Sequence, residues 1–377
     1  MKQSLQALEH FFPPDFVASL SEENFLHKLL NGQYSGAEIW RQHINECLEL
    51  ALRYRLVDAD LEARLKKGDR EVFDAAMNEL KCAKFLEGIF EVDSLHWHPQ
   101  GREKKVGEFE LLLRKGDKPI FVEVKTVFPR DLERLERRII DKLCRYTEQV
   151  PFPFALDVHI KETGTSENFS GRKFKGFLTE ELGKINTEDA AGGSSKLADY
   201  RDDNTGLYLE IATISVPPKP RQKMAYLGII GGEARSLENK EYLKHSLRRA
   251  YEQLPEGKQP CLVVLCSSTA FPIDEDDLLN ALLGTLALRF YQFTDRTAKV
   301  PEPEWFRKLD GFYHPRRNRK LSATALYSEK FAESGIGKNI EIYHNPFALD
   351  SLNYSLFNDK GVRQLVKKND KEMEWIS

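Results

Sequence analysis

The sequence has few features that would define a familiar metal or redox site. Its five cysteines are scattered, and no two of them form a Cys-x-x-Cys pair; they stand at positions 47, 82, 144, 261 and 266. Such a spacing provides neither a zinc motif nor a disulfide framework. Reduced thiols of this kind are typical of a cytosolic protein, because disulfides persist mainly in oxidising compartments.

Long apolar runs are also missing. The strongest run, residues 261–266, is far too short to cross a bilayer as a helix. Residues 1–12 carry charged side chains and lack the apolar core of a signal peptide. We therefore expect a soluble, cytoplasmic protein that has no membrane partner.

Neither sign of charge dominates the chain, whose formal net charge is -3. The balance does not by itself indicate nucleic-acid binding, although a local basic stripe would be hidden in the sum. No glycine-rich phosphate loop occurs in the sequence, so ATP-driven chemistry has no support. What is present is a chain of 377 residues, 41% of them hydrophobic, which is enough to bury a sizeable core.

Apolar periodicity predicts a helical beginning followed by alternating strands and helices. Helices are expected within 1–67 and over 70–87, where Gly88 would provide the C-cap. The other predicted helices cover 131–149, 239–254 and 275–288, and the predicted strands cover 106–113, 120–127, 154–160, 207–216, 225–230, 260–266, 321–327 and 340–343. The prediction is an α/β fold with a mixed central sheet flanked by helices and an N-terminal helical region.

Three regions are expected along the chain. They are an N-terminal helical region, residues 1–67, a core, 68–290, and a C-terminal extension, 291–377, whose strands pack on the core. The core contains a polar insertion near 161–206, in which 190–195 is expected to be a mobile loop. Because a helix-then-strand pattern occurs both before and after the insertion, we expect one sheet to continue across it.

Two neighbouring predicted strands carry an unusual set of charges. Glu108 and Glu110 share one face of the first strand, and Glu123 and Lys125 share one face of the second, because side chains alternate along a strand. A hairpin turn centred on Gly116-Asp117 would place Glu110 opposite Glu123 and Glu108 opposite Lys125. All four side chains would then lie on one face of the pair.

Crowded carboxylates repel one another unless a cation compensates for their charge. Hard oxygen ligands suit Mg²⁺ or Mn²⁺, and a lysine is able to orient a water or hold a phosphate. Carboxylates, a divalent metal and a lysine are the groups that metal-assisted phosphodiester hydrolysis requires. The alternative interpretation is an exposed strand pair with ordinary surface charges.

This segment resembles the PD-(D/E)XK nuclease superfamily, which has the restriction-endonuclease-like fold. Gly107-Glu108-Phe109-Glu110-Leu111 stands where such proteins often have Pro-Asp-Phe-Glu-Leu, and Glu123-Val124-Lys125 matches their E-x-K. The resemblance covers about residues 70–160, and an extension to Cys266 is expected. The resemblance implies that Glu108, Glu123 and the Val124 carbonyl bind Mg²⁺ or Mn²⁺ and that Lys125 is the catalytic lysine. Glycine replaces the family's proline and glutamate its aspartate, so Glu110 competes with Glu108 as the ligand.

Further residues follow from the same resemblance. Many members have an acid on the helix before the first strand, and Glu79 matches it, which makes it a fourth candidate catalytic residue and metal ligand. The alternative for Glu79 is a solvated position at the flank of the helix. Lys142, Tyr146 and Gln149 resemble the basic or Gln/Tyr positions near such sites, with a salt-bridged helix face as the alternative. A basic cluster that would contact phosphates contains Arg316, Arg317 and Arg319, with a solvated loop as its alternative.

The leading hypothesis is therefore a magnesium-dependent nuclease whose nucleic-acid partner is DNA in preference to RNA. The alternative is a catalytically decayed restriction-endonuclease-like module that acts in nucleic-acid binding or protein assembly. The replacement of aspartate by Glu108 and the acidic net charge favour this second hypothesis.

Overall fold

The computed structural model describes most of the chain as two compact units. One unit contains residues 1–128 and 238–377, and the other contains residues 129–237. The described residues are 5–22, 24–32, 36–90, 92–103, 106–113, 118–128, 139–140, 142–152, 155–162, 169–185, 195–214, 226–232, 239–267, 273–290, 302–332, 335–357, 361–369 and 372–377.

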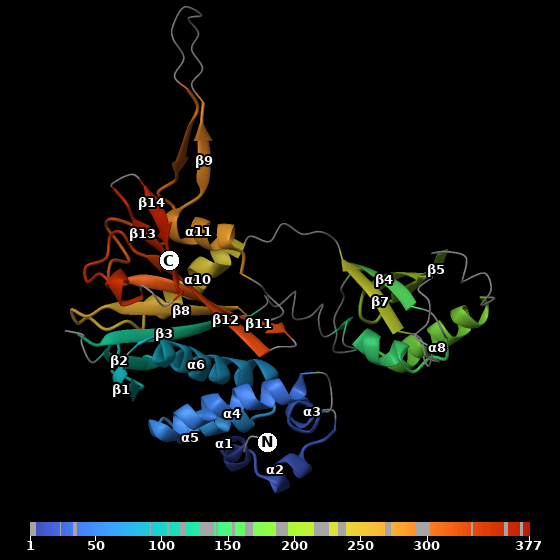
Figure 1. Ribbon diagram of the computed structural model, residues 1–377. Coiled ribbons are helices and arrows are strands. Elements are labelled where there is room, and N and C mark those ends of the chain that lie inside the picture. Colours follow the sequence, from blue (N-terminus) through green and yellow to red (C-terminus); the bar gives the residue numbers. More distant parts are fainter. Residues whose placement is uncertain are drawn as a thin grey trace, which may run out of the picture. The chain divides into compact units, whose positions relative to one another are not determined.

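The first unit is built on an eight-stranded mixed sheet (Figure 1). Strands β3, β8 and β11 run parallel to one another, and β12 is parallel to β13, whereas the other neighbours are antiparallel. In spatial order the strands are β1 (Val92–Trp97), β2 (Phe109–Leu113), β3 (Ile120–Val127), β8 (Cys261–Ser267), β11 (Ala323–Ala332), β12 (Gly335–His344), β13 (Arg363–Lys367) and β14 (Met373–Ile376). The predicted α/β class with a mixed sheet is confirmed.

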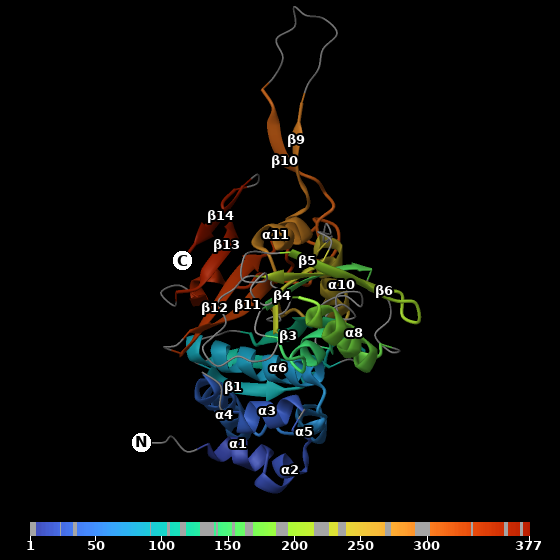
Figure 2. The ribbon, with the colours of Figure 1, turned by 90° about the vertical axis from the view of Figure 1, so that its right-hand side faces the viewer.

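Helices cover both faces of this sheet, as Figures 1 and 2 show. Val122 and Val124 point into an apolar core shared with the N-terminal helices, whereas Phe121 and Val263 point into a second core shared with the later helices. The first group is α1 (Gln6–Phe11), α2 (Pro14–Ser19), α3 (Phe25–Asn31), α4 (Ala37–Arg53), α5 (Ala59–Lys66) and α6 (Arg70–Ile89); the second is α10 (Asn239–Tyr251) and α11 (Glu275–Leu283). None of the described helices is long and apolar enough to cross a membrane.

The helix α6 begins where its sequence predicts and ends later than predicted. The Asp69 side chain accepts a hydrogen bond from the Val72 N–H and so satisfies one of the unpaired amides of the first turn. The prediction that Gly88 is the C-cap is wrong, because the helix continues to Ile89 and is capped at Phe90. Ile89 is itself buried, so the apolar stripe extends past the glycine.

The regions are divided differently from the expected boundaries. The N-terminal helices share one continuous apolar core with α6 and the sheet, so residues 1–67 do not form a region of their own. The C-terminal strands do not pack on the core as an extension; they are strands of the same sheet, since β11 pairs with β8 in parallel. A strand's apolar pattern indicates a buried sheet position but does not specify its neighbour.

The second unit has a four-stranded sheet in the order β5-β6-β4-β7, and the helix α8 packs on β5. Its elements are β4 (Ala155–Glu162), α8 (Gly171–Gly183), β5 (Ser195–Asp202), β6 (Leu207–Ile214) and β7 (Tyr226–Gly232). The two helix-then-strand patterns end in β4 and β8, which belong to different sheets, so the expectation that they share one sheet across the insertion is wrong. The expected polar insertion contains α8 and β5, and residues 190–194 of the expected loop lie outside the described residues.

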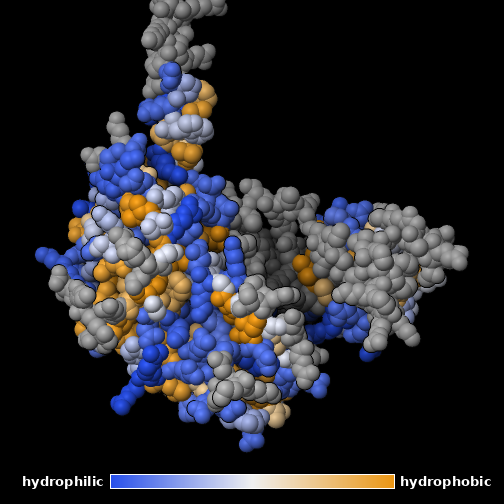
Figure 3. Space-filling view, viewed as in Figure 1, coloured by the Kyte–Doolittle hydropathy of each residue, from blue (hydrophilic) through white to orange (hydrophobic). Residues whose placement is uncertain are grey.

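The end of α11 departs from the predicted helix 275–288. The helix stops at Leu283, and Gly284 follows with φ +98°, a conformation that favours glycine. Residues beyond it form an antiparallel pair of strands, β9 (Leu286–Arg289) and β10 (Glu304–Arg307). Trp305 is largely exposed, and hydrophobic and hydrophilic residues alternate on the face of this pair seen in Figure 3.

Candidate active site

The pairing of β2 with β3 brings the predicted site residues together in a register shifted from the predicted one. Glu110 lies opposite Phe121, not opposite Glu123, and the paired region ends where Phe109 meets Val122. The predicted turn at 116–117 lies outside the described residues. Because side chains alternate with a period of two, a shift of two residues keeps every side chain on its predicted face.

The Lys125 side chain lies next to the carboxylates of both Glu108 and Glu123. Its ammonium Nζ forms an ion pair with Oε1 of Glu123 and lies 3.9 Å from Oε1 of Glu108. The Glu123 side chain has no exposed surface, whereas 24% of the Lys125 side chain is exposed. Glu110 is held elsewhere, because its Oε1 accepts a hydrogen bond of 3.0 Å from Gln259. The geometry therefore favours Glu108 over Glu110 as the partner of Glu123.

The two carboxyl groups are held in surroundings that disfavour their charges. Burial raises the pKa of Glu123 to about 7, although the neighbouring Lys125 opposes this change. Burial, together with the charges of Glu79 and Glu123, also raises the pKa of Glu108 well above its usual range. A further cation beside these groups would stabilise their ionised forms.

Glu79 reaches this cluster from α6. Its carboxylate accepts two hydrogen bonds from Arg64 of α5, of 2.6 and 2.9 Å, in the bidentate arrangement that gives strong charge-assisted pairs. Only 7% of the Glu79 side chain is exposed, so the solvated alternative is wrong. Burial raises the pKa of Glu79, while Arg64 opposes the change. Sequence analysis did not identify Arg64, because its spacing of four residues from Asp60 is typical of an ordinary surface ion pair on a helix.

The backbone of Val124 faces the edge of β3 at which β2 has ended. The Phe121 N–H donates to the Pro260 carbonyl on the β8 side. Since backbone groups point to alternate sides along a strand, those of Val122 and Val124 point to the β2 side. Val124 lies beyond the last β2 pair, so its predicted role as a carbonyl ligand is compatible with this geometry.

Two observations bear on a metal ion at this position. Oε1 of Glu123 is ion-paired with Lys125, but the buried Oε2 has no hydrogen-bond partner, so the carboxylate has unused capacity as a ligand. Yet among the described residues no three Asp, Glu, His or Cys side chains are arranged to hold a metal ion. The donor types suit Mg²⁺ or Mn²⁺. In this structure, however, Lys125 and Arg64 are the cations that contact Glu123 and Glu79.

The remaining predicted contacts have structural partners of their own. Tyr146 packs its ring over Gly171, where an added Cβ would lie 1.7 Å from the ring, and Gln149 accepts a hydrogen bond from Lys175. These residues and Lys142, which also has an interaction partner, belong to the second unit. Residues 131–138 of the predicted helix lie outside the described residues.

The basic cluster before β11 is only partly available for phosphate contacts. Arg316 and Arg317 are exposed, whereas Arg319 donates a hydrogen bond from Nε to the carbonyl of Phe347. The cluster precedes Ala323, which pairs with Leu262 near the beginning of β8. The cluster therefore lies at the end of the sheet where β3 and β8 begin.

Comparison with known proteins assigns no family. No protein-family model, curated protein or solved structure matches this chain.

Proposed function

We propose that this chain is a metal-dependent nuclease that hydrolyses phosphodiester bonds, with DNA preferred over RNA. The observation that supports the proposal is the meeting of Glu108, Glu123 and Lys125 at the end of the β2–β3 ladder. There, Oε2 of the buried Glu123 carboxylate lacks a hydrogen-bond partner, whereas Oε1 is ion-paired with Lys125. A buried carboxylate oxygen normally has a partner, so Oε2 is suited to a ligand that the chain does not itself provide.

Glu108, Glu123 and the Val124 carbonyl are the groups that would hold Mg²⁺ or Mn²⁺. When bound, the ion would polarise the phosphoryl group and lower the pKa of a coordinated water. The Lys125 ammonium, which is partly exposed, would hold a phosphate oxygen or orient the attacking water. Glu79 acts as a positioning residue, since Arg64 anchors it and its charge raises the proton affinity of Glu108.

The test is a nuclease assay with Mg²⁺ and with Mn²⁺ on single-stranded DNA, duplex DNA and RNA. We expect Lys125→Ala and Glu108→Gln to lose roughly 100-fold or more of the cleavage rate, because each removes a group that acts on the phosphate or the metal. Glu110→Gln is the matched control, because Glu110 lies only two residues further along the chain but has Gln259 as its partner. Its rate should stay within a few-fold of wild type. Equal losses in Glu110→Gln and Glu108→Gln would contradict the assigned site.

The second candidate is a module that binds nucleic acid or a protein partner without catalysis. The observation in its favour is that Arg64 and Lys125 already neutralise Glu79 and Glu123. Calorimetric titration with Mn²⁺ separates the two candidates. Binding that is lost in Glu123→Ala supports catalysis, whereas no binding to the wild-type chain supports the module.

A further inference from the structure

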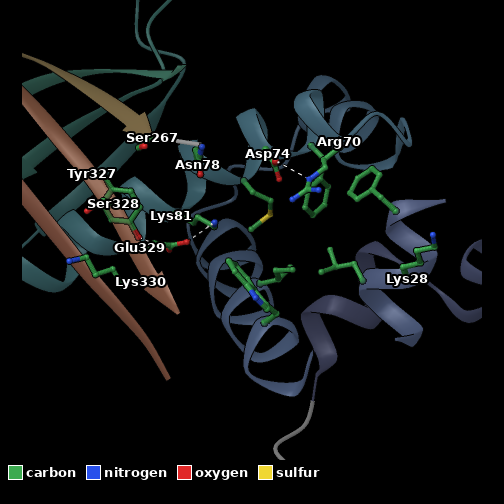
Figure 4. A pocket seen from close by; sticks show the side chains of 16 residues that line it. Lys28, Arg70, Asp74, Asn78, Lys81, Ser267, Tyr327, Ser328, Glu329 and Lys330 are labelled. Carbon is green, nitrogen blue, oxygen red and sulfur yellow. Dashed lines mark hydrogen bonds and ion pairs between the residues drawn. The ribbon is translucent and has the colours of Figure 1, made fainter. Parts of the chain in front are cut away.

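A cavity of about 630 Å³ opens in the first unit between α3, α4, α6 and the end of β11 (Figure 4). Small-molecule sites commonly have volumes of about 300 to 1,000 Å³. Glu108, Glu123 and Lys125 do not line this cavity. A ligand in it would therefore be separate from the strand that the proposed nuclease cleaves, and what the cavity binds does not depend on the nuclease proposal.

The cavity lies beside the carboxyl ends of parallel strands. Thr126, near the end of β3, is paired with Cys266 of β8, which is paired in turn with Tyr327 of β11. Tyr327 and Ser267, the last residue of β8, line the cavity, and Figure 4 shows both of them near Asn78 of α6. In open sheets with parallel strands, ligands bind outside the carboxyl ends of the strands. The place of the cavity in the fold is therefore that of a ligand site.

The walls of the cavity are largely aromatic and aliphatic. Phe25 of α3 and Phe73 of α6 form an edge-to-face pair with ring centroids 5.4 Å apart, and Trp40 of α4 and Met77 of α6 continue the apolar surface. Aromatic walls of this kind favour a flat ring, because stacking adds to the burial of apolar area.

The acidic side chains at the cavity are already paired with cations of the chain. Glu329 on β11 lies 2.8 Å from Nζ of Lys81, and this ammonium group also lies 5.2 Å from the centre of the Trp40 ring. Asp74 lies 3.6 Å from Arg70 on the same helix. A charged ligand group would have to separate one of these pairs, which costs free energy where the pair is buried.

Two further lysines belong to the ends of the cavity. Figure 4 shows Lys28 on α3 and Lys330 on β11 at opposite ends, with their ammonium groups directed outward. No single ligand group would meet both, so they do not form an anion site. The paired charges and the outward lysines together favour an uncharged ligand.

One polar group of the wall would recognise the edge of a bound ring. Asn78 is buried and lines the cavity, and its Nδ2 donates a hydrogen bond of 3.0 Å to Thr126 of β3. That bond uses one amide proton, and among the residues that the structure describes the second proton and the carbonyl oxygen have no hydrogen-bond partner. A purely apolar ring would leave these two groups unpaired, which costs free energy.

The remaining proton and oxygen of this amide match a ligand on which a donor and an acceptor are neighbours. Adenine has such an edge, where its exocyclic amino group donates and N7 accepts, whereas guanine has only acceptors on the same edge. We propose that this cavity binds adenosine as a free nucleoside. The adenine ring lies against the aromatic wall, and its amino group donates to Oδ1 of Asn78 while N7 accepts from Nδ2.

Calorimetric titration of the full chain with adenosine tests the proposal. Purine riboside is the matched probe, because it lacks only the exocyclic amino group. We expect adenosine to bind about tenfold more tightly, a difference of about 1.4 kcal/mol, because purine riboside leaves Oδ1 of Asn78 unpaired. AMP should bind no more tightly than adenosine, since Lys28 and Lys330 are directed outward. No binding of adenosine, equal binding of purine riboside, or tighter binding of guanosine or AMP would overturn the proposal.

Asn78→Leu should remove the preference for the amino group. Leucine is of similar size and has no hydrogen-bonding group, so adenosine and purine riboside should bind this variant about equally. Asn204→Leu is the matched control, because Asn204 is exposed in the second unit and does not line the cavity. It should keep the tenfold preference. A preference that survives in Asn78→Leu, or one that is lost in Asn204→Leu, would overturn the proposal.

Trp40→Ala tests the aromatic wall without changing the amide. Trp40 is only partly buried, so the fold should be preserved, and thermal unfolding checks this. Adenosine and purine riboside should both bind about tenfold more weakly, because a stacking surface is lost, and the ratio of their affinities should stay the same. Unchanged binding of both nucleosides would place the ligand elsewhere and overturn the proposal.

Discussion

Glu123 illustrates how much one side chain depends on its surroundings. On a strand in water it would be an ordinary acid, but between two covered faces of a sheet it has no exposed surface. Lys125, two residues further along the same strand, is the cation that it contacts. The pair is local in sequence, and for that reason the E-x-K pattern identified it without a structure.

Glu123→Gln should change the pH dependence of stability. The folded chain holds a proton on Glu123 up to about pH 7, whereas the unfolded chain releases it near the usual value of 4.5. The folded state therefore binds more protons between these values, so stability falls as pH rises, by up to about 1.4 kcal/mol per pH unit. The amide variant has no such titration, and removing the charge also eases ionisation of Glu108.

Urea unfolding at several pH values between 5 and 7.5 measures this effect. The wild type should lose stability relative to Glu123→Gln across that window and change little above it. Parallel curves for the two proteins would show that the Glu123 carboxyl titrates normally in the fold.

Glu329→Gln should destabilise the first unit at neutral pH. Burial raises the pKa of Glu329, but the hydrogen bonds and charges of His43 and Lys81 outweigh it and hold the pKa far below its usual range. The stabilisation is therefore present above the unfolded pKa and is lost as pH falls through the lower folded value. Breaking a buried pair leaves Lys81 uncompensated, which costs about 3 to 5 kcal/mol.

Chemical unfolding at pH 7 and at pH 3 measures the loss. The control is Glu62→Gln, which removes an exposed partner of Lys66 on α5 and should cost less than about 1 kcal/mol. If the two variants cost the same at pH 7, the buried network does not stabilise the fold.

At the scale of elements, α6 places two consecutive polar side chains against different partners. Asn78 and Glu79 are consecutive, and successive helix residues point about 100° apart because a turn takes about 3.6 residues. Asn78 thus donates a hydrogen bond to Thr126 of β3, while Glu79 accepts hydrogen bonds from Arg64 of α5. The hydrophobic stripe predicts this helix, but it does not predict which neighbour each polar residue meets.

The first turn of α6 should depend on its cap. Asp69→Ala removes the acceptor for the Val72 N–H and should lower the free energy of unfolding by about 1 kcal/mol. Asp15→Ala, in the first turn of α2 where no side-chain cap forms, is the control and should cost no more than about 0.5 kcal/mol. The measurement is the urea midpoint of both variants; equal costs would show that the cap contributes nothing specific.

For β2 and β3, the sequence predicts the face on which each side chain lies but not the register of the two strands. Alternation of side chains predicted which residues share a face, and that part is correct because it depends only on strand geometry. The pairing of Glu110 with Phe121 depends on the connecting segment and on Gln259 from a distant part of the chain. The sequences of β2 and β3 alone therefore do not determine their register.

At the scale of the whole molecule, the two units divide the chain in a way that permits a direct test. Residues 129–237 contribute none of the strands of the eight-stranded sheet. The chain on either side of them comes together, because the Tyr242 hydroxyl donates to the Phe128 carbonyl at 2.7 Å. A short glycine-serine linker is thus long enough to replace the second unit.

We expect the chain in which such a linker replaces 129–237 to fold cooperatively, because both apolar cores of the first unit remain complete. Circular dichroism and urea unfolding provide the measurement. The matched control is the same linker placed in the full chain after residue 128. An unfolded or aggregated deletion variant beside a folded control would show that the first unit needs residues 129–237.

The sequence by itself determined the features that depend on near neighbours. These are the amphipathic helices, the buried strands, the shared face of Glu123 and Lys125, and the shared face of Glu108 and Glu110. They follow from backbone periodicity, which acts over a few residues. Only the tertiary structure decided that Arg64 holds Glu79, that Glu329 joins His43 and Lys81, and that β4 belongs to a separate sheet. Those contacts form when segments that are distant in the sequence pack together, and local sequence patterns do not predict which segments will pack.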